Sequence, residues 1–314
     1  MRLLLTFWAV LLLLLAATAG VLQYLGPPKA LVAATLPLAA PAVPAATGPA
    51  APDPALHEAR AEDPTSFLPR VAPDGRRAMT IYAAPAHIPP GAKTVAILVA
   101  GMGLSQSTSM TAINQLPAAV SFAFSPYSAD PAPLLDAARA KGHEYLLSLP
   151  LEPAGAPLSD EGAHALQTGS EPGANFINLE WALSRIDGYV GVTSALDGMK
   201  GEAYLRSGDL YASLQDQISQ RGLLFIDARP GAAAPARAVG RSADLVIDDP
   251  DDPASIDAKL AALLALAQRN GSALGVAGPL RPQTLAHLAA WIAALPTHGV
   301  TLVPVSAEVA QAAP

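Results

Sequence analysis

Cysteine is absent from this chain of 314 residues. Without cysteine the protein can form neither a disulfide nor a thiolate metal site. Positive charge is also scarce, since the formal net charge is −7 and residues 93–314 contain no cluster of Lys or Arg. Proteins that bind nucleic acids carry basic patches, so a nucleic-acid partner is excluded.

Several catalytic and cofactor motifs are missing as well. No GxGxxG follows a predicted strand and no P-loop occurs, so the sequence gives no support for a nucleotide cofactor. No HxxxH or HExxH pair occurs, and His143, at a helix end before a strand, is expected to pack or cap rather than to bind a metal. No Gly-x-Ser-x-Gly elbow occurs, although four serines lie near predicted strand ends, at Ser105, Ser125, Ser148 and Ser194.

An apolar stretch without a charge runs from Leu3 to Leu22, directly after Arg2. We predict that residues 1–26 form an uncleaved transmembrane anchor, because about twenty apolar residues span a bilayer. The folded domain would then be exported to the periplasm and held at the cell inner membrane. A cleavable signal peptide is the alternative, with a small-residue cleavage region at residues 16–19 and a secreted product.

Residues 27–92 are rich in alanine and proline and poor in aromatic residues. Such a segment cannot bury enough apolar surface to offset the entropy of ordering it. We therefore predict a disordered, semi-extended linker that tethers the following domain. A proline-rich motif that binds a partner is the alternative.

Residues 93–314 alternate between short apolar runs and amphipathic stretches. Buried strands alternating with helices indicate a parallel sheet with crossover helices. About seven or eight such units favour a barrel or distorted barrel over an open sheet. The predicted strands are 95–99, 120–124, 145–149, 189–192, 223–227, 245–247, 272–276 and 300–303, and the predicted helices are 108–115, 132–141, 204–221, 256–269 and 285–295.

The functional groups of a parallel α/β fold lie at the carboxyl ends of its strands. The first strand ends in Ala100, Gly101, Met102 and Gly103 and offers nothing ionisable. The first carboxylate in the series is Glu152, and Asp227 with Arg229 and then Asp248 follow at later strand ends. None of these strand ends carries a histidine.

Seven segments follow one another in a characteristic order. They are VAILVAGMGL at 95–104, VSFAFSPYS at 120–128, PLLDAARAKGHE at 133–144, YLLSLPLEP at 145–153, GYVGV at 188–192, RGLLFIDAR at 221–229 and GVTLVPVS at 299–306. In this order they resemble the divergent polysaccharide deacetylase family, a distant branch of the NodB-type carbohydrate esterases. The resemblance covers residues 93–308 and implies a distorted (β/α) barrel.

The resemblance also implies hydrolysis of N-acetyl carbon–nitrogen bonds in a polysaccharide, assisted by a divalent metal such as zinc. Family members carry an Asp-Asp pair at the end of the first strand, where this chain has Ala100 and Gly101. A histidine after the fourth strand falls at or near Ala195, and another before a late proline falls at or near Gly278. Because these residues have no ligating side chain, we predict that no metal and no other cofactor is bound.

The remaining polar groups have two interpretations each. Asp227 and Arg229 either form an ion pair that braces a strand end or face a sugar or anion in the groove. Glu152, between two prolines, has the same two interpretations, a structural one and a functional one. The acidic run 248–252 is either a solvated loop with a helix start at Asp252 or, as the less favoured interpretation, a calcium site.

Two functions follow. The first is a glycan- or partner-binding module of the cell envelope that lacks metal-dependent deacetylase activity. The second is an active divergent carbohydrate esterase with Asp227 and Glu152 as catalytic residues and with Arg229 and Asp248 as ligand-binding residues. Whether the protein is an enzyme at all stays open from the sequence. The expected partners are envelope glycan or an envelope protein, and the membrane through the N-terminal segment.

Overall fold

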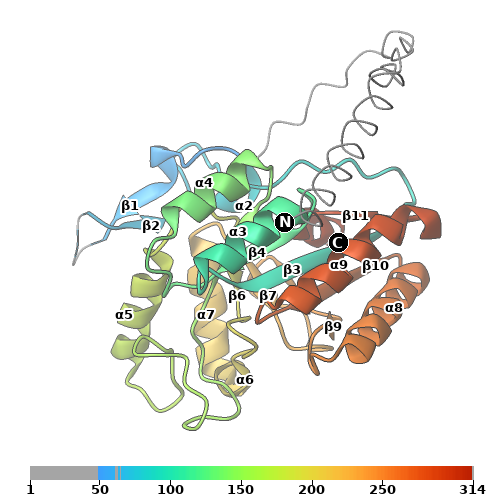
Figure 1. Cartoon of the computed structure of the whole chain (residues 1–314). Helices are drawn as coiled ribbons and strands as arrows, with labels where there is room; N and C mark the ends of the chain where they lie inside the picture. Colours follow the sequence, from blue (N-terminus) through green and yellow to red (C-terminus); the bar gives the residue numbers. More distant parts are fainter. Residues whose placement is uncertain (1–48, 61–62, 64, 313–314) are drawn as a thin grey trace, which may run out of the picture. The chain divides into compact units, whose positions relative to one another are not determined.

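The computed structural model describes residues 49–60, 63 and 65–312 (Figure 1). The predicted membrane anchor, residues 1–26, and residues 27–48 of the predicted linker lie outside the described residues. Within the described ranges, no helix is long and apolar enough to cross a membrane.

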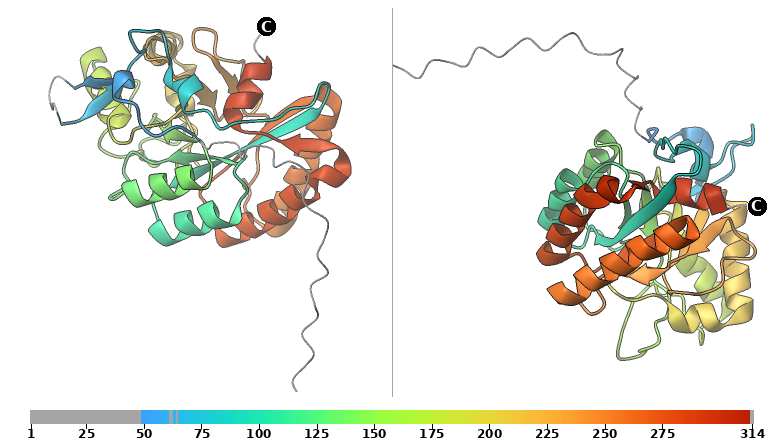
Figure 2. Two further views of the ribbon diagram at one scale, coloured as in Figure 1. Left: turned by 90° about the horizontal axis from the view of Figure 1, so that it is seen from above. Right: turned by 90° about the vertical axis from the view of Figure 1, so that its right-hand side faces the viewer.

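Nine parallel strands of the described chain form one sheet (Figures 1 and 2). Their order is β8-β7-β6-β5-β4-β3-β10-β9, and β11 is added beside β3. The strands are β3 (Lys93–Met102), β4 (Ser121–Phe124), β5 (Tyr145–Ser148), β6 (Gly191–Thr193), β7 (Leu224–Asp227), β8 (Gly240–Ser242), β9 (Leu245–Val246), β10 (Ser272–Ala277) and β11 (Val300–Leu302).

The longest strand, β3, organises the sheet. One edge of β3 pairs with β10 from Thr94 to Val99. The other edge is shared by two strands, because β11 pairs with its first residues and β4 with its last. The register shifts after Val99, and Gly101 adopts a φ of 79°, a region that favours glycine. The first strand therefore ends in a kinked segment.

The segment 240–246 joins the two edges of the sheet. Its first half, β8, pairs with β7, and its second half, β9, pairs with β10. Between them, the amide of Ala243 donates to the carbonyl oxygen of Asp227 at 2.8 Å, and the amide of Asp244 donates to that of Leu274 at 2.9 Å. The sheet is thus a distorted (β/α) barrel, as the sequence predicted.

Helices connect successive strands and lie outside the sheet (Figure 2). The predicted start of one helix is confirmed, since Asp252 accepts a hydrogen bond from the amide of Ser255 at 3.0 Å, as an N-cap residue does. The helices are α3 (Gln106–Gln115), α4 (Ala132–Ala140), α5 (Pro172–Leu183), α6 (Glu202–Arg206), α7 (Gly208–Gln220), α8 (Pro253–Asn270), α9 (Pro282–Ala294) and α10 (Val305–Ala312).

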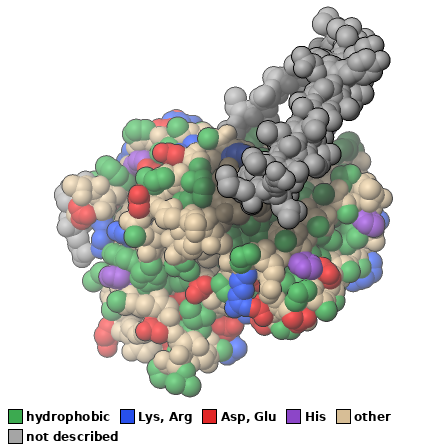
Figure 3. Space-filling view, in the orientation of Figure 1, with side chains coloured by type: hydrophobic (Ala, Val, Ile, Leu, Met, Phe, Trp, Pro, Cys, Tyr) green, Lys and Arg blue, Asp and Glu red, His purple; other side chains and the backbone are tan. Residues whose placement is uncertain are grey.

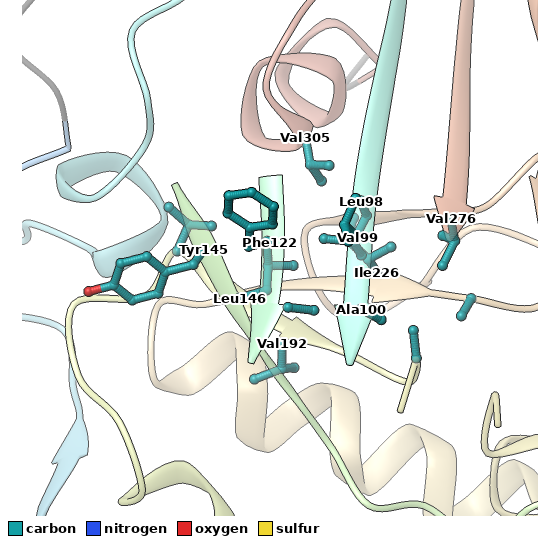
Figure 4. Close-up of a cluster of buried hydrophobic side chains, with 14 of the residues drawn as sticks. Leu98, Val99, Ala100, Phe122, Tyr145, Leu146, Val192, Ile226, Val276 and Val305 are labelled. Atoms are coloured by element: carbon teal, nitrogen blue, oxygen red, sulfur yellow. The ribbon is translucent and has the colours of Figure 1, made fainter. Parts of the chain in front are cut away.

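The core lies among the strands and the helices that cover them, whereas acidic, basic and apolar side chains are interspersed on the face shown in Figure 3. Figure 4 shows Leu98, Phe122, Tyr145, Val192 and Ile226 converging from five neighbouring strands, and all five are buried. Aromatic and branched residues of this kind fit the pleated surface of a buried sheet. The predicted strands are confirmed in position, with ends that differ by a few residues.

Four elements of the barrel domain were not predicted. They are α5, β8, α10 and the 3-10 helix η2 (Leu295–His298), each short or weakly periodic in sequence. The predicted helix 204–221 is also divided, because Ser207 adopts an extended conformation (φ −76°, ψ 102°) between α6 and α7. These differences are local and leave the strand order unchanged.

Two buried carboxylates hold α10 against the amino ends of the strands. Glu144, directly before β5, accepts hydrogen bonds from Ser121 Oγ at 2.8 Å and from the amide of Ser306 at 2.9 Å. Glu308 accepts from Thr94 Oγ1 at 2.7 Å and from Arg241 at 2.8 Å. Burial raises the pKa of Glu308. The amino end of the barrel is therefore a closed, structural end.

The linker prediction is wrong for the described residues between 49 and 92. These residues form a 3-10 helix η1 (Pro54–Leu56), an antiparallel pair β1 (His57–Ala59) and β2 (Phe67–Pro69), and a short helix α2 (Ala78–Ile81). Leu56, Leu68 and Tyr82 join the main core. Widely spaced apolar residues thus bury enough surface to order a proline-rich segment. The compact unit begins near residue 46 and not at 93.

Candidate functional site

The residues at the predicted metal positions lie at the carboxyl end of the barrel. Ala100 and Gly101 belong to the kinked end of β3, and Figure 4 shows Ala100 at this end of the strand. Gly278 follows β10 and packs directly against Ala100. A Cβ atom on Gly278 would lie 3.0 Å from the Cβ of Ala100 and 3.2 Å from its carbonyl carbon. Backbone atoms and a methyl group therefore fill this contact.

The residues present do not fit a divalent ion. Ala100, Gly101, Ala195 and Gly278 offer no side-chain donor, whereas metal sites in proteins need oxygen, nitrogen or sulfur ligands. In the part of the chain that the structure describes, no group of three or more His, Asp or Glu side chains is placed to hold a metal. The calcium interpretation of the acidic run 248–252 has no supporting ligand cluster either.

Asp248 braces the loop after β10. Its side chain is 6% exposed, and both of its carboxylate oxygens accept from the amide of Gly278, at 3.0 and 2.9 Å. Burial raises the pKa of Asp248, and the Gly278 hydrogen bond opposes that shift. The carboxylate is thus engaged by backbone, and its predicted role in ligand binding stays a prediction.

Asp227 and Arg229 form an ion pair at the end of β7, which was one of the two predictions for these residues. Asp227 is fully buried, and Arg229 donates to it from Nε at 3.0 Å and from Nη2 at 2.6 Å. This hydrogen bonding raises the pKa of Arg229. The guanidinium also lies over the ring of Tyr211, 5.7 Å from its centroid. Asp227 therefore has its charge already neutralised in place.

Glu152 is engaged by a different loop. Its carboxylate accepts a hydrogen bond from the amide of Thr168, and its backbone carbonyl accepts from Ala203 at 3.1 Å at the start of α6. Strand β6 lies between β5, which Glu152 follows, and β7, which ends in Asp227. The two predicted catalytic carboxylates thus brace separate loops, and no hydrogen bond joins them within the described structure.

A pocket opens at the same end of the barrel. Its volume is about 210 Å³. We call it the acidic pocket, and it is lined by Leu104, Ser125, Tyr127, Asp160, Glu161, Gly162, Leu196, Asp197 and Met199. These residues follow β3, β4 and β6 or belong to the loop between β5 and α5. The pocket therefore lies where parallel α/β folds place ligands.

Glu161 is the unusual group of this pocket. Its side chain is 3% exposed, and neither carboxyl oxygen has a hydrogen-bond partner in the described structure. Burial raises its pKa to about 9, and the nearby charges of Glu202, Asp197 and Asp160 add to the shift. At neutral pH the Glu161 carboxyl group is therefore protonated and can donate a hydrogen bond.

The wall of the acidic pocket is preformed. The ring of Tyr127 packs 5.2 Å from the ring of Trp181, and His164 stacks on that indole at 3.7 Å. Gly162 (φ 91°) lies so close that a Cβ there would be 2.8 Å from Tyr127 Cζ. This close approach permits only glycine.

One residue of the pocket has a strained backbone. Asp197 has a φ of 44° and is the one non-glycine residue of the described chain with a positive φ. Aspartate tolerates this region better than most residues, and such strain tends to occur at functional positions.

Sequence reasoning missed the acidic pocket for a physical reason. Inspection of strand ends finds Ser125 and residues 194–197, but Glu161 belongs to a loop that is distant from any strand end. The adjacent acids Asp160 and Glu161 before Gly162 are the available signal. Of the two, only Glu161 is buried, in a loop whose Gly162 packs on Tyr127, a residue that is separated from it in sequence.

Comparison with known proteins identifies the family. A profile of the divergent polysaccharide deacetylase family matches residues 97–309, and the chain belongs to this family. The crystal structure of uncharacterized protein ATU2773 from Agrobacterium tumefaciens C58 is similar, with a TM-score of 0.70 and 33% identity over 77% of this chain and 99% of that one.

A second solved structure is more distant. It is the catalytic domain of a peptidoglycan N-acetylglucosamine deacetylase from Eubacterium rectale ATCC 33656, with a TM-score of 0.47 and 14% identity over 70% of this chain and 92% of that one. No curated protein shows significant similarity to the chain.

Proposed function

We propose that this chain is a non-catalytic member of its family that binds a saccharide unit of cell-envelope glycan in the acidic pocket. The observation that carries the proposal is the position of the pocket at the carboxyl end of the barrel, where its lining residues Leu104 and Leu196 closely follow Gly101 and Ala195 in the chain. The predicted metal positions have no ligating side chain, while a ligand-sized space is present. Export through the predicted N-terminal segment would bring the domain to the envelope.

The shape and lining of the pocket suit a sugar ring. A volume of about 210 Å³ is below that of most drug-sized sites and matches a single small ligand. Leu104, Leu196 and Met199 supply apolar surface, and the ring of Tyr127 supplies a flat wall. Ser125 and the carboxyl groups supply hydrogen-bonding partners for hydroxyl groups. Protein sites for small ligands combine apolar walls with a few polar groups in this way.

The engaged carboxylates argue against hydrolysis. A general base must have a free lone pair within hydrogen-bond reach of the attacking water. Asp227 is bound by Arg229, and Asp248 is bound by the Gly278 amide. Glu161 is protonated at neutral pH and cannot accept a proton. The active-esterase alternative is less well supported, because Asp227 is held by Arg229 and Glu152, which accepts from the Thr168 amide, shares no hydrogen bond with Asp227 within the described residues.

The proposal is tested by measuring binding and turnover on the same preparation. Calorimetric titration with tetrasaccharides of glucosamine and of N-acetylglucosamine measures binding, and an acetate assay measures turnover. We expect binding of at least one of these ligands and no acetate release. Leu104→Arg, which places a large side chain at a pocket-lining residue that is 48% exposed, should weaken binding at least tenfold.

The matched control is Val239→Arg, at a similarly exposed residue (44%) that directly precedes β8 at the other end of the barrel. It should leave binding unchanged. Absence of binding to both tetrasaccharides would overturn the proposal. Acetate release that is lost in Asp227→Ala would instead establish the esterase.

A further inference from the structure

We infer that the acidic pocket selects an amino sugar whose nitrogen is free and carries a positive charge, in preference to its N-acetylated form. This inference rests on the proposed function and names the ligand class. A protein of this kind would bind the glycan that results from de-N-acetylation, not the glycan on which a deacetylase acts.

The charges around the pocket carry the inference. Asp160 and Asp197 are exposed carboxylates of its lining, and Glu202 lies near enough to act on Glu161. No Lys or Arg is among the lining residues of the described pocket. The nearby Lys200 lies 3.3 Å from Asp249 and 3.3 Å from the Gly198 carbonyl oxygen. Within the described residues, Asp160, Glu161 and Asp197 thus form no ion pair, although Glu202 also acts on Arg229.

The unpartnered carboxyl of Glu161 is the second, independent observation. A buried polar group without a partner is unfavourable, and a ligand that supplies a partner removes that penalty. An ammonium group supplies three donors and a positive charge. An acetamido group is neutral and larger, so it can neither offset the charges of Asp160 and Asp197 nor fit the same space as easily.

Binding involves a small local movement. Both oxygens of Glu161 are shielded from solvent in the ligand-free structure, so the side chain or its loop must shift for direct contact. In the loop between β5 and α5, Leu158 is 97% exposed, whereas Gly162 is in close contact with Tyr127, so the Glu161 side chain is expected to move while the tyrosine wall stays in place. Asp160 and Asp197, which are already exposed, provide the first contacts.

The chemistry predicts a proton linkage. The groups that face Glu161 are Asp160 from its own loop, Asp197 after β6, Glu202 at the start of α6 and the Tyr127 hydroxyl after β4. A bound ammonium group favours the ionised carboxylate, so binding releases the Glu161 proton to solvent. Affinity for the free amine should therefore rise with pH between 5.5 and 7, by up to about tenfold per pH unit. Affinity for the N-acetylated sugar should not rise in this way.

The experiment compares the two tetrasaccharides by calorimetry on the full chain in detergent, at pH 5.5 and pH 7 and at physiological salt. We expect the glucosamine form to bind at least tenfold more tightly at pH 7. Glu161→Gln should remove the pH dependence and most of the preference. Asp197→Asn should reduce the preference by a charge effect, which provides a second variant if Glu161→Gln is poorly folded.

The matched control is Glu171→Gln, at an exposed carboxylate before α5 and outside the pocket, and it should change neither quantity. Equal or tighter binding of the N-acetylated form would overturn the inference and leave the proposed function in place. A preference that persists in both pocket variants would place the ammonium site elsewhere and would also overturn it. Absence of binding to either sugar would overturn the proposed function itself.

Discussion

Glu161 makes the stability of the protein depend on pH. Its pKa is about 9 in the folded protein, against an ordinary value of 4.5. Between these values the folded state holds a proton that the unfolded state has lost, so the free energy of unfolding falls as pH rises. We expect Glu161→Gln to stabilise the protein at pH 7 by about 3 kcal/mol and to have little effect at pH 4.5. Urea unfolding at both pH values measures the difference.

A matched control separates this effect from general charge. Glu171 is exposed at the start of α5, so Glu171→Gln should leave the pH dependence of unfolding as it is. If Glu161→Gln and the unaltered protein lose stability in parallel between pH 5 and pH 8, the carboxyl group is not protonated in the folded state.

Arg229 should matter for stability more than for chemistry. Its removal leaves the buried carboxylate of Asp227 without its cation, and breaking a buried pair in this way costs about 3–5 kcal/mol. We therefore expect Arg229→Ala to lower the free energy of unfolding by that order, and the double variant Asp227→Asn with Arg229→Ala to recover part of it. Urea unfolding measures both. An Arg229→Ala protein of undiminished stability that no longer binds glycan would make Arg229 a ligand-binding residue.

Local sequence signals predicted the roles of individual residues where those roles depend on neighbours in the chain. Asp252 caps α8 because its side chain reaches an amide three residues ahead. His143 packs as expected, with Nδ1 2.8 Å from the Val120 carbonyl oxygen, and burial lowers its pKa. The burial of Glu161 could not be predicted from such signals, because it depends on the fold of its loop against Tyr127, a residue that is distant in sequence. The prediction of no metal rested on resemblance and stays a prediction about binding.

At the scale of elements, residues 49–84 act as part of the domain. Leu56, Leu68, Ala78 and Tyr82 are buried against it. The Tyr82 hydroxyl accepts from the amide of Asp53 at 2.8 Å, and Glu144 accepts from that of Ala84 at 2.9 Å. The alanine and proline content of this segment concealed these contacts, because burial depends on a few spaced side chains and not on average composition.

A protein that begins at residue 93 should be markedly less stable than one that begins at 46. Exposing the surface covered by Leu56, Leu68 and Tyr82 loses about 1.5–3 kcal/mol for each large side chain, so we expect a decrease of at least about 4 kcal/mol. Thermal and urea unfolding of the two proteins measure it. Tyr82→Phe is the control, because it removes only one hydrogen bond and should cost about 1 kcal/mol. Equal stability of the two proteins would restore the linker prediction.

At the scale of the whole molecule, the alternation of strands and helices was enough to predict the barrel. What the sequence could not provide was its closure. Residues 240–246 contain two very short strands, β8 and β9, and their pairing with β7 and β10 is a long-range event. The sequence signal there is weak because Arg241, Ser242 and Asp244 interrupt the apolar residues. The alternation predicted a barrel or distorted barrel, and the resemblance to the family implied the distorted form.

At the carboxyl end of the barrel, the positions predicted for metal ligands are closely packed. Gly278 (φ 151°) packs on Ala100, and Pro279 packs on Gly198, where a Cβ would lie 3.1 Å from the proline ring. Ala100 and Ala195 are buried, at 1% and 4% exposed. Placing the predicted ligands there means inserting larger side chains at buried positions, and at Gly278 against a direct contact with Ala100.

We expect that the combined variant Ala100→Asp, Gly101→Asp, Ala195→His and Gly278→His will not regain metal binding. The Gly278→His change alone puts a Cβ at 3.0 Å from Ala100 in a conformation that L side chains rarely adopt, and overpacking of this kind costs about 1–3 kcal/mol per site. Urea unfolding with and without zinc, together with metal analysis, tests this. One tightly bound zinc per chain, with a matching gain in the free energy of unfolding, would contradict this expectation. It would show that the carboxyl end of the barrel can accommodate the four ligands. The acidic pocket would then be part of an active site that lacks only its metal ligands.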